Sequence, residues 1–152
     1  MPGQTGETLI GLFSPAAKAQ ERTNRDKAMR LLEAVKLETA AERPAGELPF
    51  GQQKLLSLLR AVATGARVLL LDEPAAGVEI DLIPRVIDLI RGLVKAEGRA
   101  TFLVEHNIDL VREVADQVCV LQGGHIIASG TAQRVLGDET VIREYLGRVY
   151  NA

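Results

Sequence analysis

The sequence predicts an α/β fold with at least two parallel strands and a β-hairpin near the C-terminus. Two short apolar runs, residues 68–71 and 100–104, have the composition of strands that are buried on both faces of a parallel sheet. Helical spacing before, between and after these runs gives the order of an α/β protein. The 152 residues are enough for one domain with a real core.

Three helices are predicted before the second strand. The first starts at Asn24, and a polar loop over residues 38–47 follows it. The second starts near Gly51 and ends at Gly65. The third runs from an N-cap at Asp81 to about residue 96. The apolar faces of the three helices are formed by Ala28, Leu31, Leu32 and Val35, by Leu55, Leu58, Leu59 and Val62, and by Ile83, Val86, Ile87, Ile90, Leu93 and Val94.

The elements after the second strand are shorter. Asn107 is expected to cap a helix, and a hairpin turning at a Gly-Gly pair is predicted over residues 117–129. Thr131 and Asp138 can cap two closing helices, the second of which ends at Gly147.

Composition and charge narrow the classes of function. The net charge is −2, so electrostatic binding to the phosphate backbone of nucleic acid is not expected. Aromatic residues make up 3% and Trp is absent, so stacking of bases on aromatic side chains is not expected either. No apolar run approaches the roughly 18 residues of a membrane span, and the N-terminus lacks a signal pattern, so the chain is expected to be cytoplasmic. Cys119 is the only cysteine, which excludes an internal disulfide and predicts a small buried hydrophobe.

The first strand ends in two adjacent carboxylates, Asp72 and Glu73, and Pro74 then stops it. Two carboxylates are costly to place at a buried strand end, and ligands of α/β sheets sit at the carboxyl ends of strands. One carboxylate can hold Mg²⁺ while its neighbour orients or deprotonates a water. The alternative is a surface turn with two solvated acids, and the pair alone does not decide between them.

Two further features point to phosphate. The segment LPFGQQ, residues 48–53, stands at a helix start, where a Gly and unpaired backbone N–H groups make a phosphate-binding surface. His106 follows the second strand and can contact the same site as Asp72 and Glu73 if the two strands are neighbours. Taken alone, His106 is better explained as a surface residue at a helix start, so the combination carries the interpretation.

In this order, the motifs resemble the ATP-binding cassette of ABC transporters, from its signature motif to its C-terminus. LPFGQQ is similar to the signature motif, RVLLLDEP to Walker B with its catalytic glutamate, PAAGVEI to the D-loop and VEH to the switch-histidine segment. Together with TGE, LLEAVKL and the closing EYLG, they are most similar to the ATPase subunits of branched-chain amino acid importers.

The resemblance implies a role for each matching residue. Asp72 would hold Mg²⁺, Glu73 would polarise the attacking water as general base, and His106 would contact the γ-phosphate. The signature residues would face ATP held by a partner cassette, and they are Leu48, Phe50, Gly51, Gln52 and Gln53.

The resemblance also implies an architecture and partners. The fold would be a partial P-loop NTPase domain, with residues 1–49 as part of the helical subdomain and residues 50–152 as the C-terminal part of the ATPase core. The implied partners are a second cassette and membrane permease subunits, which would place the assembled chain at the periphery of the inner membrane.

The sequence departs from the family's pattern at several points. Pro49 stands where the signature motif usually has Ser, Phe50 replaces the usual Gly or Tyr, and Glu79 replaces the Asp or Asn of the D-loop. No GxxxxGK[ST], the loop that cradles phosphates, occurs in the chain. We therefore expect a C-terminal portion of a cassette without the P-loop strand, which alone binds Mg-ATP weakly or not at all.

A missing strand has structural consequences. The apolar faces of the two predicted strands would be under-covered and one strand edge unpaired, so self-association or marginal stability is expected.

Two other interpretations remain beside an incomplete importer ATPase. One is a non-enzymatic module that supplies a signature face to a complete cassette in trans. The other is the C-terminal half of a split-cassette chromosome-maintenance ATPase, a class that should show long heptads before the signature motif.

Overall fold

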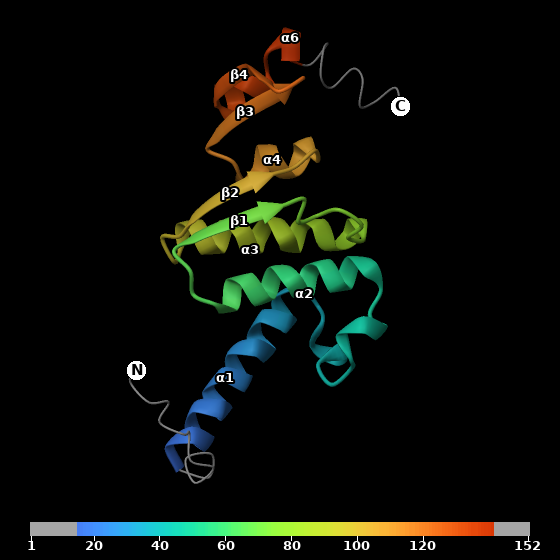
Figure 1. Cartoon of the computed structure of the whole chain (residues 1–152), viewed down its shortest axis with the longest axis vertical. Helices are drawn as coiled ribbons and strands as arrows, with labels where there is room; N and C mark the ends of the chain where they lie inside the picture. The colour runs from blue at the N-terminus through green and yellow to red at the C-terminus, as the bar shows by residue number, and fades with distance from the viewer. Residues whose placement is uncertain (1–14, 142–152) are drawn as a thin grey trace, which may run out of the picture.

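The computed structural model describes residues 15–141, and the predicted helix end at Gly147 and the segments TGE and EYLG lie outside this range. Figure 1 shows the helices α1 to α3 stacked on one side of two short strands, with a hairpin at the opposite end. The elements are α1 Pro15–Ala34, η2 Glu38–Ala40, η3 Ala45–Glu47, α2 Phe50–Ala63, β1 Val68–Asp72, η4 Ile80–Leu82, α3 Ile83–Lys95, β2 Ala100–Val104, α4 Ile108–Val114, β3 Gln117–Gln122, β4 His125–Thr131, α5 Ala132–Leu136 and α6 Glu139–Val141.

Helix α1 begins well before the predicted start at Asn24. Its first half has no apolar face, but it is rich in strong helix formers and opens on Pro15, a residue that the first turn tolerates. Ala28 is exposed, so the predicted apolar face is confirmed only towards the C-terminal end, where Val35 is completely buried. The helix therefore forms along its full length by propensity, and packing begins only at its last turn.

The predicted boundaries of α2 and α3 differ in accuracy. Helix α2 is confirmed. Just after its last residue, the Gly65 N–H donates a hydrogen bond to the Val62 carbonyl at 3.1 Å. The N-cap predicted at Asp81 is wrong, because Asp81 lies inside the 3₁₀ turn η4 and α3 starts at Ile83 without a side-chain cap.

The two strand pairs form separate sheets within the described residues. β1 and β2 are parallel and in register, from Val68 opposite Ala100 to Asp72 opposite Val104. β3 and β4 form the predicted antiparallel hairpin. The parallel pair and the hairpin are thus confirmed, but the hairpin does not extend the parallel sheet.

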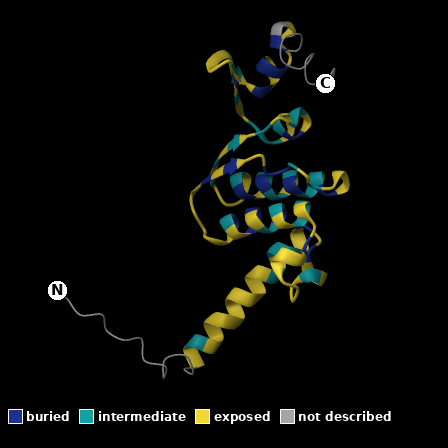
Figure 2. Ribbon diagram, turned by 45° about the vertical axis from the view of Figure 1, so that its right-hand side comes forward, coloured by how far each residue is buried: buried dark blue, intermediate teal, exposed yellow. Residues whose placement is uncertain are grey.

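The parallel pair is covered on one face only. Leu69 and Leu71 pack into the main core with residues of α2, α3 and α4. On the opposite face Leu70 is 76% exposed and its cross-strand neighbour Phe102 is 63% exposed. Burial on both faces was therefore a wrong prediction, whereas the expected under-covered strands are confirmed (Figure 2). We call this surface the uncovered face, and its residues are Val68, Leu70, Phe102 and Val104.

The C-terminal caps follow the prediction. The side chain of Asn107 accepts the Leu110 N–H at 3.0 Å, and that of Thr131 accepts the Arg134 N–H at 3.4 Å. The Asp138 carboxylate accepts the N–H of Val141 at 3.4 Å. Short polar residues at these three positions therefore set where the small helices begin.

Cys119 is exposed, which contradicts the predicted buried hydrophobe. Side chains alternate along a strand, and Val118 and Val120, on either side of Cys119, pack towards α5 instead.

No helix among the described residues combines the length and the apolar composition needed to cross a membrane.

Candidate active site

The candidate active site lies where β1 and β2 end side by side. Asp72 is the last residue of β1 and is paired with Val104, the last residue of β2. Glu73 and His106 follow from these neighbouring strand ends. The two strands are neighbours, which was the condition for His106 to reach the acids, and the predicted acids and histidine therefore share one edge of the sheet.

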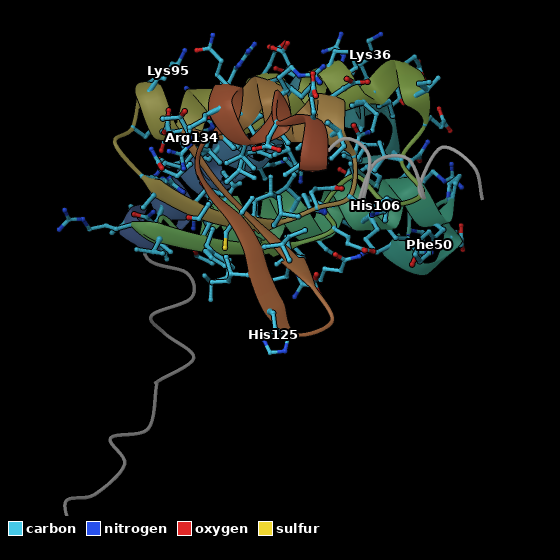
Figure 3. The ribbon with its side chains drawn as sticks, turned by 90° about the horizontal axis from the view of Figure 1, so that it is seen from above. Lys36, Phe50, Lys95, His106, His125 and Arg134 are labelled. Atoms are coloured by element: carbon cyan, nitrogen blue, oxygen red, sulfur yellow. The ribbon has the colours of Figure 1, made fainter. Side chains whose placement is uncertain are left out.

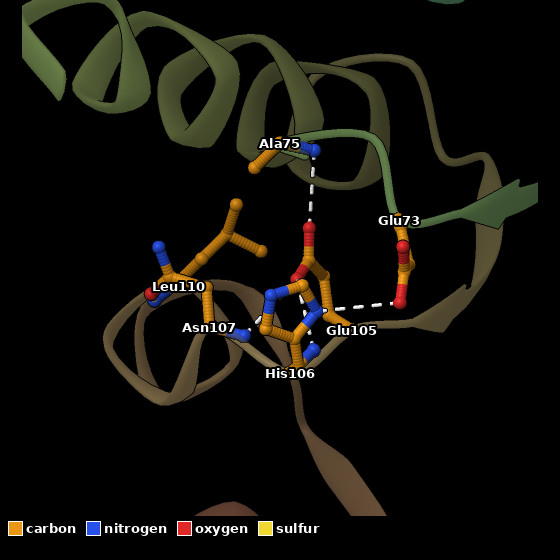
Figure 4. A network of polar contacts seen from close by, with 6 residues as sticks. All are labelled: Glu73, Ala75, Glu105, His106, Asn107 and Leu110. Atoms are coloured by element: carbon orange, nitrogen blue, oxygen red, sulfur yellow. Dashed lines mark hydrogen bonds and ion pairs between the residues drawn. The ribbon is translucent and has the colours of Figure 1, made fainter. Parts of the chain in front are cut away.

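Glu73 and His106 face each other across this edge. The distance from His106 Nδ1 to Glu73 Oε1 is 3.3 Å (Figure 4). Both side chains stay open to solvent, with 49% of Glu73 and 59% of His106 exposed. Because the pair combines a proton acceptor with an imidazole and remains accessible, it can orient a water molecule beside a phosphate oxygen.

The backbone of Glu73 is strained. Its φ is +44°, in the left-handed region that residues with a Cβ rarely adopt. The Glu73 N–H donates to the carbonyl of Val104 at 2.8 Å, and Pro74 after it is buried. Strained backbone of this kind gathers at functional sites, where the surroundings hold it in place.

Asp72 is exposed, and the strand end predicted to be buried is therefore open. The reason is the alternation of side chains along β1, which places Asp72 on the same side as Leu70, on the uncovered face. Its carboxylate has no hydrogen-bond or ion-pair partner among the described residues. These residues also contain no cluster of three or more potential metal ligands. Asp72 thus fits Mg²⁺ only as one carboxylate beside phosphate oxygens, which is the common mode for this ion.

The signature segment turns into α2 without a side-chain cap. Pro49 occupies the N-cap position, so the first N–H groups of α2 have no partner within the helix. The Gln53 side chain donates back to the Leu48 carbonyl at 2.8 Å, and Leu48 itself is buried. Phe50 is 66% exposed, while Gln52 is half-buried. The open N–H groups make this helix start suitable for an anion.

The start of α2 packs directly on the loop that follows β1. A Cβ on Gly51 would lie 2.2 Å from the Gly77 carbonyl oxygen, and a Cβ on Gly77 would lie 2.8 Å from the Phe50 ring. Only glycines permit this approach. The signature-like and D-loop-like segments are therefore in contact within one chain.

The two halves of the predicted site are not joined directly. No hydrogen bond or ion pair in the described part of the chain links the Glu73–His106 pair to the start of α2. In the view of Figure 3, from above, Phe50 and His106 lie on the opposite side of the molecule from Lys95 and Arg134. The loop between Glu73 and Gly77 connects the two halves.

Sequence reasoning did not predict two residues of this region, Gly77 and Glu105. Gly77 carried no signal apart from its place in the D-loop-like segment. Glu105 carried the same signal as Asp72 and Glu73, because it is a carboxylate directly after an apolar strand.

Comparison with known proteins finds relatives along almost the whole chain. The family described as ABC transporter matches residues 6–76. The high-affinity branched-chain amino acid transport ATP-binding protein BraF of Pseudomonas aeruginosa is 38% identical over 144 residues, which are 91% of this chain and 55% of BraF. Over nearly its whole length the chain is similar to ATP-binding cassettes of ABC transporters. LivG of Escherichia coli K12, a protein of the same description, is 33% identical over 149 residues, which are 95% of this chain and 58% of LivG.

Solved cassettes have the same arrangement of elements. The ADP conformation of MJ1267, an ATP-binding cassette of an ABC transporter, is 33% identical, with a TM-score of 0.65 over 88% of this chain and 57% of its own. A nucleotide-free ATP-binding cassette is also 33% identical, with a TM-score of 0.60 over 95% of this chain and 57% of its own. This chain thus spans little more than half the length of the relatives that it matches.

Proposed function

We propose that this chain is the C-terminal portion of the ATP-hydrolysing subunit of an importer for branched-chain amino acids. The apposition of Glu73 and His106 at paired strand ends carries the hydrolytic part of the proposal. The transport part rests on relatives that are named for branched-chain amino acid transport. In this assignment residues 1–49 belong to the helical subdomain and residues 50–152 to the ATPase core.

The proposed reaction is in-line attack of water on the γ-phosphate of ATP. Glu73 accepts a proton from the water as its oxygen bonds to the γ-phosphorus, and the bond to the bridging oxygen breaks to leave ADP. His106 donates a hydrogen bond to a γ-phosphate oxygen and stabilises the charge that develops there. Asp72 would hold Mg²⁺, which, when bound, supplies positive charge to the phosphate oxygens.

The start of α2 would act on a different nucleotide. Its first N–H groups have no side-chain cap and the Phe50 ring is 66% exposed, which suits contact with ATP held by a second cassette. The signature residues proposed for this contact are Leu48, Phe50, Gly51, Gln52 and Gln53. Permease subunits would be the remaining partners, nucleic acid would not, and the assembled cytoplasmic subunit would be peripheral to the inner membrane.

ATP hydrolysis by a chimera tests the proposal. The N-terminal part of BraF, which should supply the P-loop absent from these 152 residues, is joined ahead of this chain and phosphate release is measured. We expect the chimera to hydrolyse Mg-ATP and Glu73→Gln to lower the rate by about 10²-fold or more, because the general base is lost. The unextended chain should bind Mg-ATP weakly or not at all by calorimetry.

The matched control is Glu21→Gln, which makes the same chemical change on the exposed surface of α1 and should leave the rate unchanged. Equal rates for Glu73→Gln and the parent chimera would refute the catalytic assignment. For the transport part, the chimera should restore uptake of a radiolabelled branched-chain amino acid in a strain without BraF. Hydrolysis without any restored uptake would remove the importer assignment and leave an ATPase.

A further inference from the structure

Glu105 is a carboxylate that the proposed reaction does not use as acid or base, yet its side chain is only 1% exposed. It follows β2 directly. The one ionisable side chain found near it within the described residues is that of His106, whose Nδ1 lies 3.9 Å from Glu105 Oε2. A carboxylate is tolerated in such a place only where polar groups replace its lost hydration.

Three backbone N–H groups compensate this carboxylate (Figure 4). Oε1 accepts the N–H of Ala75 at 3.0 Å. Oε2 accepts the N–H groups of His106 and Asn107 at 2.9 Å and 3.0 Å. Hydrogen bonds to an ionised acceptor are about twice as strong as neutral ones. One side chain therefore ties the loop after β1 to the loop that starts α4.

These two loops carry the two members of the candidate pair, since Ala75 is two residues after Glu73 and His106 is adjacent to Glu105. We propose that Glu105 is a positioning residue, which holds the Glu73 carboxylate against the His106 ring. The inference rests on the proposed function in one respect, namely that Glu73 and His106 act on water and phosphate.

The strain at Glu73 supports this role. A left-handed residue persists only where its neighbours hold it on both sides. On one side the Glu73 N–H is bonded to the carbonyl of Val104. On the other side the N–H of Ala75 is bonded to Glu105. The Ala76 N–H also donates to the Glu73 carbonyl at 3.1 Å, but that bond lies within the loop itself. Releasing the bond to Glu105 therefore frees the loop from the end of β2 on the C-terminal side of Glu73, so Glu73 can move away from His106.

Glu105→Gln should release this bond selectively. A glutamine offers one oxygen acceptor, and its NH₂ group cannot accept a hydrogen bond. The oxygen is best placed towards the two donors of His106 and Asn107, which leaves the NH₂ group facing the N–H of Ala75. Glu105→Gln therefore loosens the loop after β1 while the start of α4 stays held.

The test uses the full chain and its two histidines, His106 and His125. The ring proton signals of both are recorded by NMR at one pH in the parent chain, in Glu73→Gln, in Glu105→Gln and in the double variant. His125 lies at the hairpin, well apart from His106, and serves as the internal reference (Figure 3). Asn107→Ala is the matched control, because it removes the cap of α4 without touching Ala75.

We expect Glu73→Gln to move the His106 signal and not that of His125. When Glu105→Gln is already present, Glu73→Gln should move the His106 signal by half as much or less. When Asn107→Ala is present instead, Glu73→Gln should move the His106 signal as far as it does in the parent chain. Hydrogen exchange at the Ala75 amide should rise about tenfold or more in Glu105→Gln, because a buried donor loses its acceptor. An undiminished His106 response, or none in the parent chain, would overturn the inference.

A second variant guards against misfolding. Glu105→Asp keeps the charge but is one methylene shorter, so it should not bridge both loops and should give the same loss of coupling. Unfolding of both variants would assign Glu105 to folding alone and also overturn the inference.

In the hydrolysing chimera, Glu105→Gln should lower kcat about tenfold with an unchanged KM, because Glu105 does not touch nucleotide; an unchanged kcat would count against a positioning role. An inactive parent chimera would defeat the proposed function, whereas the NMR comparison needs no nucleotide and decides the position of Glu73 separately.

Discussion

Glu73 shows, at the residue scale, a conflict between conformation and chemistry. Its left-handed backbone costs about 1–2 kcal/mol for a residue with a Cβ. Glycine would avoid this cost, but glycine has no carboxylate to place beside His106. The retained strain is therefore a physical argument that the carboxylate at this position has a use.

Two substitutions at Glu73 separate the strain from the carboxylate. Both Glu73→Gly and Glu73→Ala remove the acid, but only glycine relaxes the left-handed backbone. We expect the Gly variant to unfold with a free energy about 1 kcal/mol higher than that of the Ala variant. Urea unfolding of the full chain measures the difference.

The matched control is the same pair of substitutions at Glu79, an exposed residue with an ordinary φ of −58°. There the Ala variant should be the more stable one, since glycine gains more entropy on unfolding. An Ala variant at position 73 that is as stable as the Gly variant would show that Glu73 is not strained.

At the scale of elements, the contact between α2 and the loop after β1 organises the site. Gly51 lies in the first turn of the helix and Gly77 in the loop. A Cβ on Gly51 would meet the Gly77 carbonyl, and a Cβ on Gly77 would meet the Phe50 ring. Because the same loop carries Glu73 and Ala75, the packing of α2 fixes one end of the segment that Glu105 holds at its centre. A substitution at the start of α2 that displaces this loop should therefore also displace Glu73 at the end of β1.

Gly51→Ala tests this contact. The added Cβ would lie 2.2 Å from the Gly77 carbonyl oxygen, so helix and loop must separate, and we expect a loss of about 1–3 kcal/mol in unfolding free energy. Gly92→Ala in α3 is the control, because nothing lies within 4 Å of its Cβ and helix propensity predicts a gain of about 0.5–1 kcal/mol. If Gly51→Ala is as stable as the parent chain, the helix and the loop do not pack as described.

At the scale of the whole molecule, the uncovered face is the dominant feature. Leu70 and Phe102 lie directly opposite each other across the parallel strands, and Val68 and Val104 extend the same face. Leu121 and Ile126 of the hairpin are exposed as well, at 59% and 65%. Burying one such side chain is worth about 1.5–3 kcal/mol. A surface of this kind favours association with other apolar surfaces.

We expect the isolated chain to self-associate through the uncovered face. Light scattering after size-exclusion chromatography should give a mass above 16.4 kDa that rises with concentration. The double variant Leu70→Gln, Phe102→Gln should shift the mass towards the monomer. Ile80→Gln, which changes an apolar side chain that is 89% exposed elsewhere, should not. A monomeric parent chain with a sharp, high melting transition at all concentrations would contradict this prediction.

Local pattern was sufficient for the elements and for the motif residues. Apolar spacing located α2, α3 and both parallel strands, because each of these segments buries a defined face against the core. The same criterion placed the start of α1 too late, since its first half buries nothing and forms by propensity. It also put Cys119 in the core, because an apolar run does not reveal which of its faces is covered.

The sequence by itself identified Asp72, Glu73 and His106 as candidate site residues, because they stand directly after two apolar runs and meet at one edge of a parallel sheet if the two strands are neighbours. Only the tertiary structure decided how they are held. The bridge from Glu105 to Ala75 and the approach of Gly51 to Gly77 join residues far apart in the chain, and no local periodicity encodes such contacts. Burial was likewise decided in three dimensions, because helices cover one face of β1 and β2 and leave the other open.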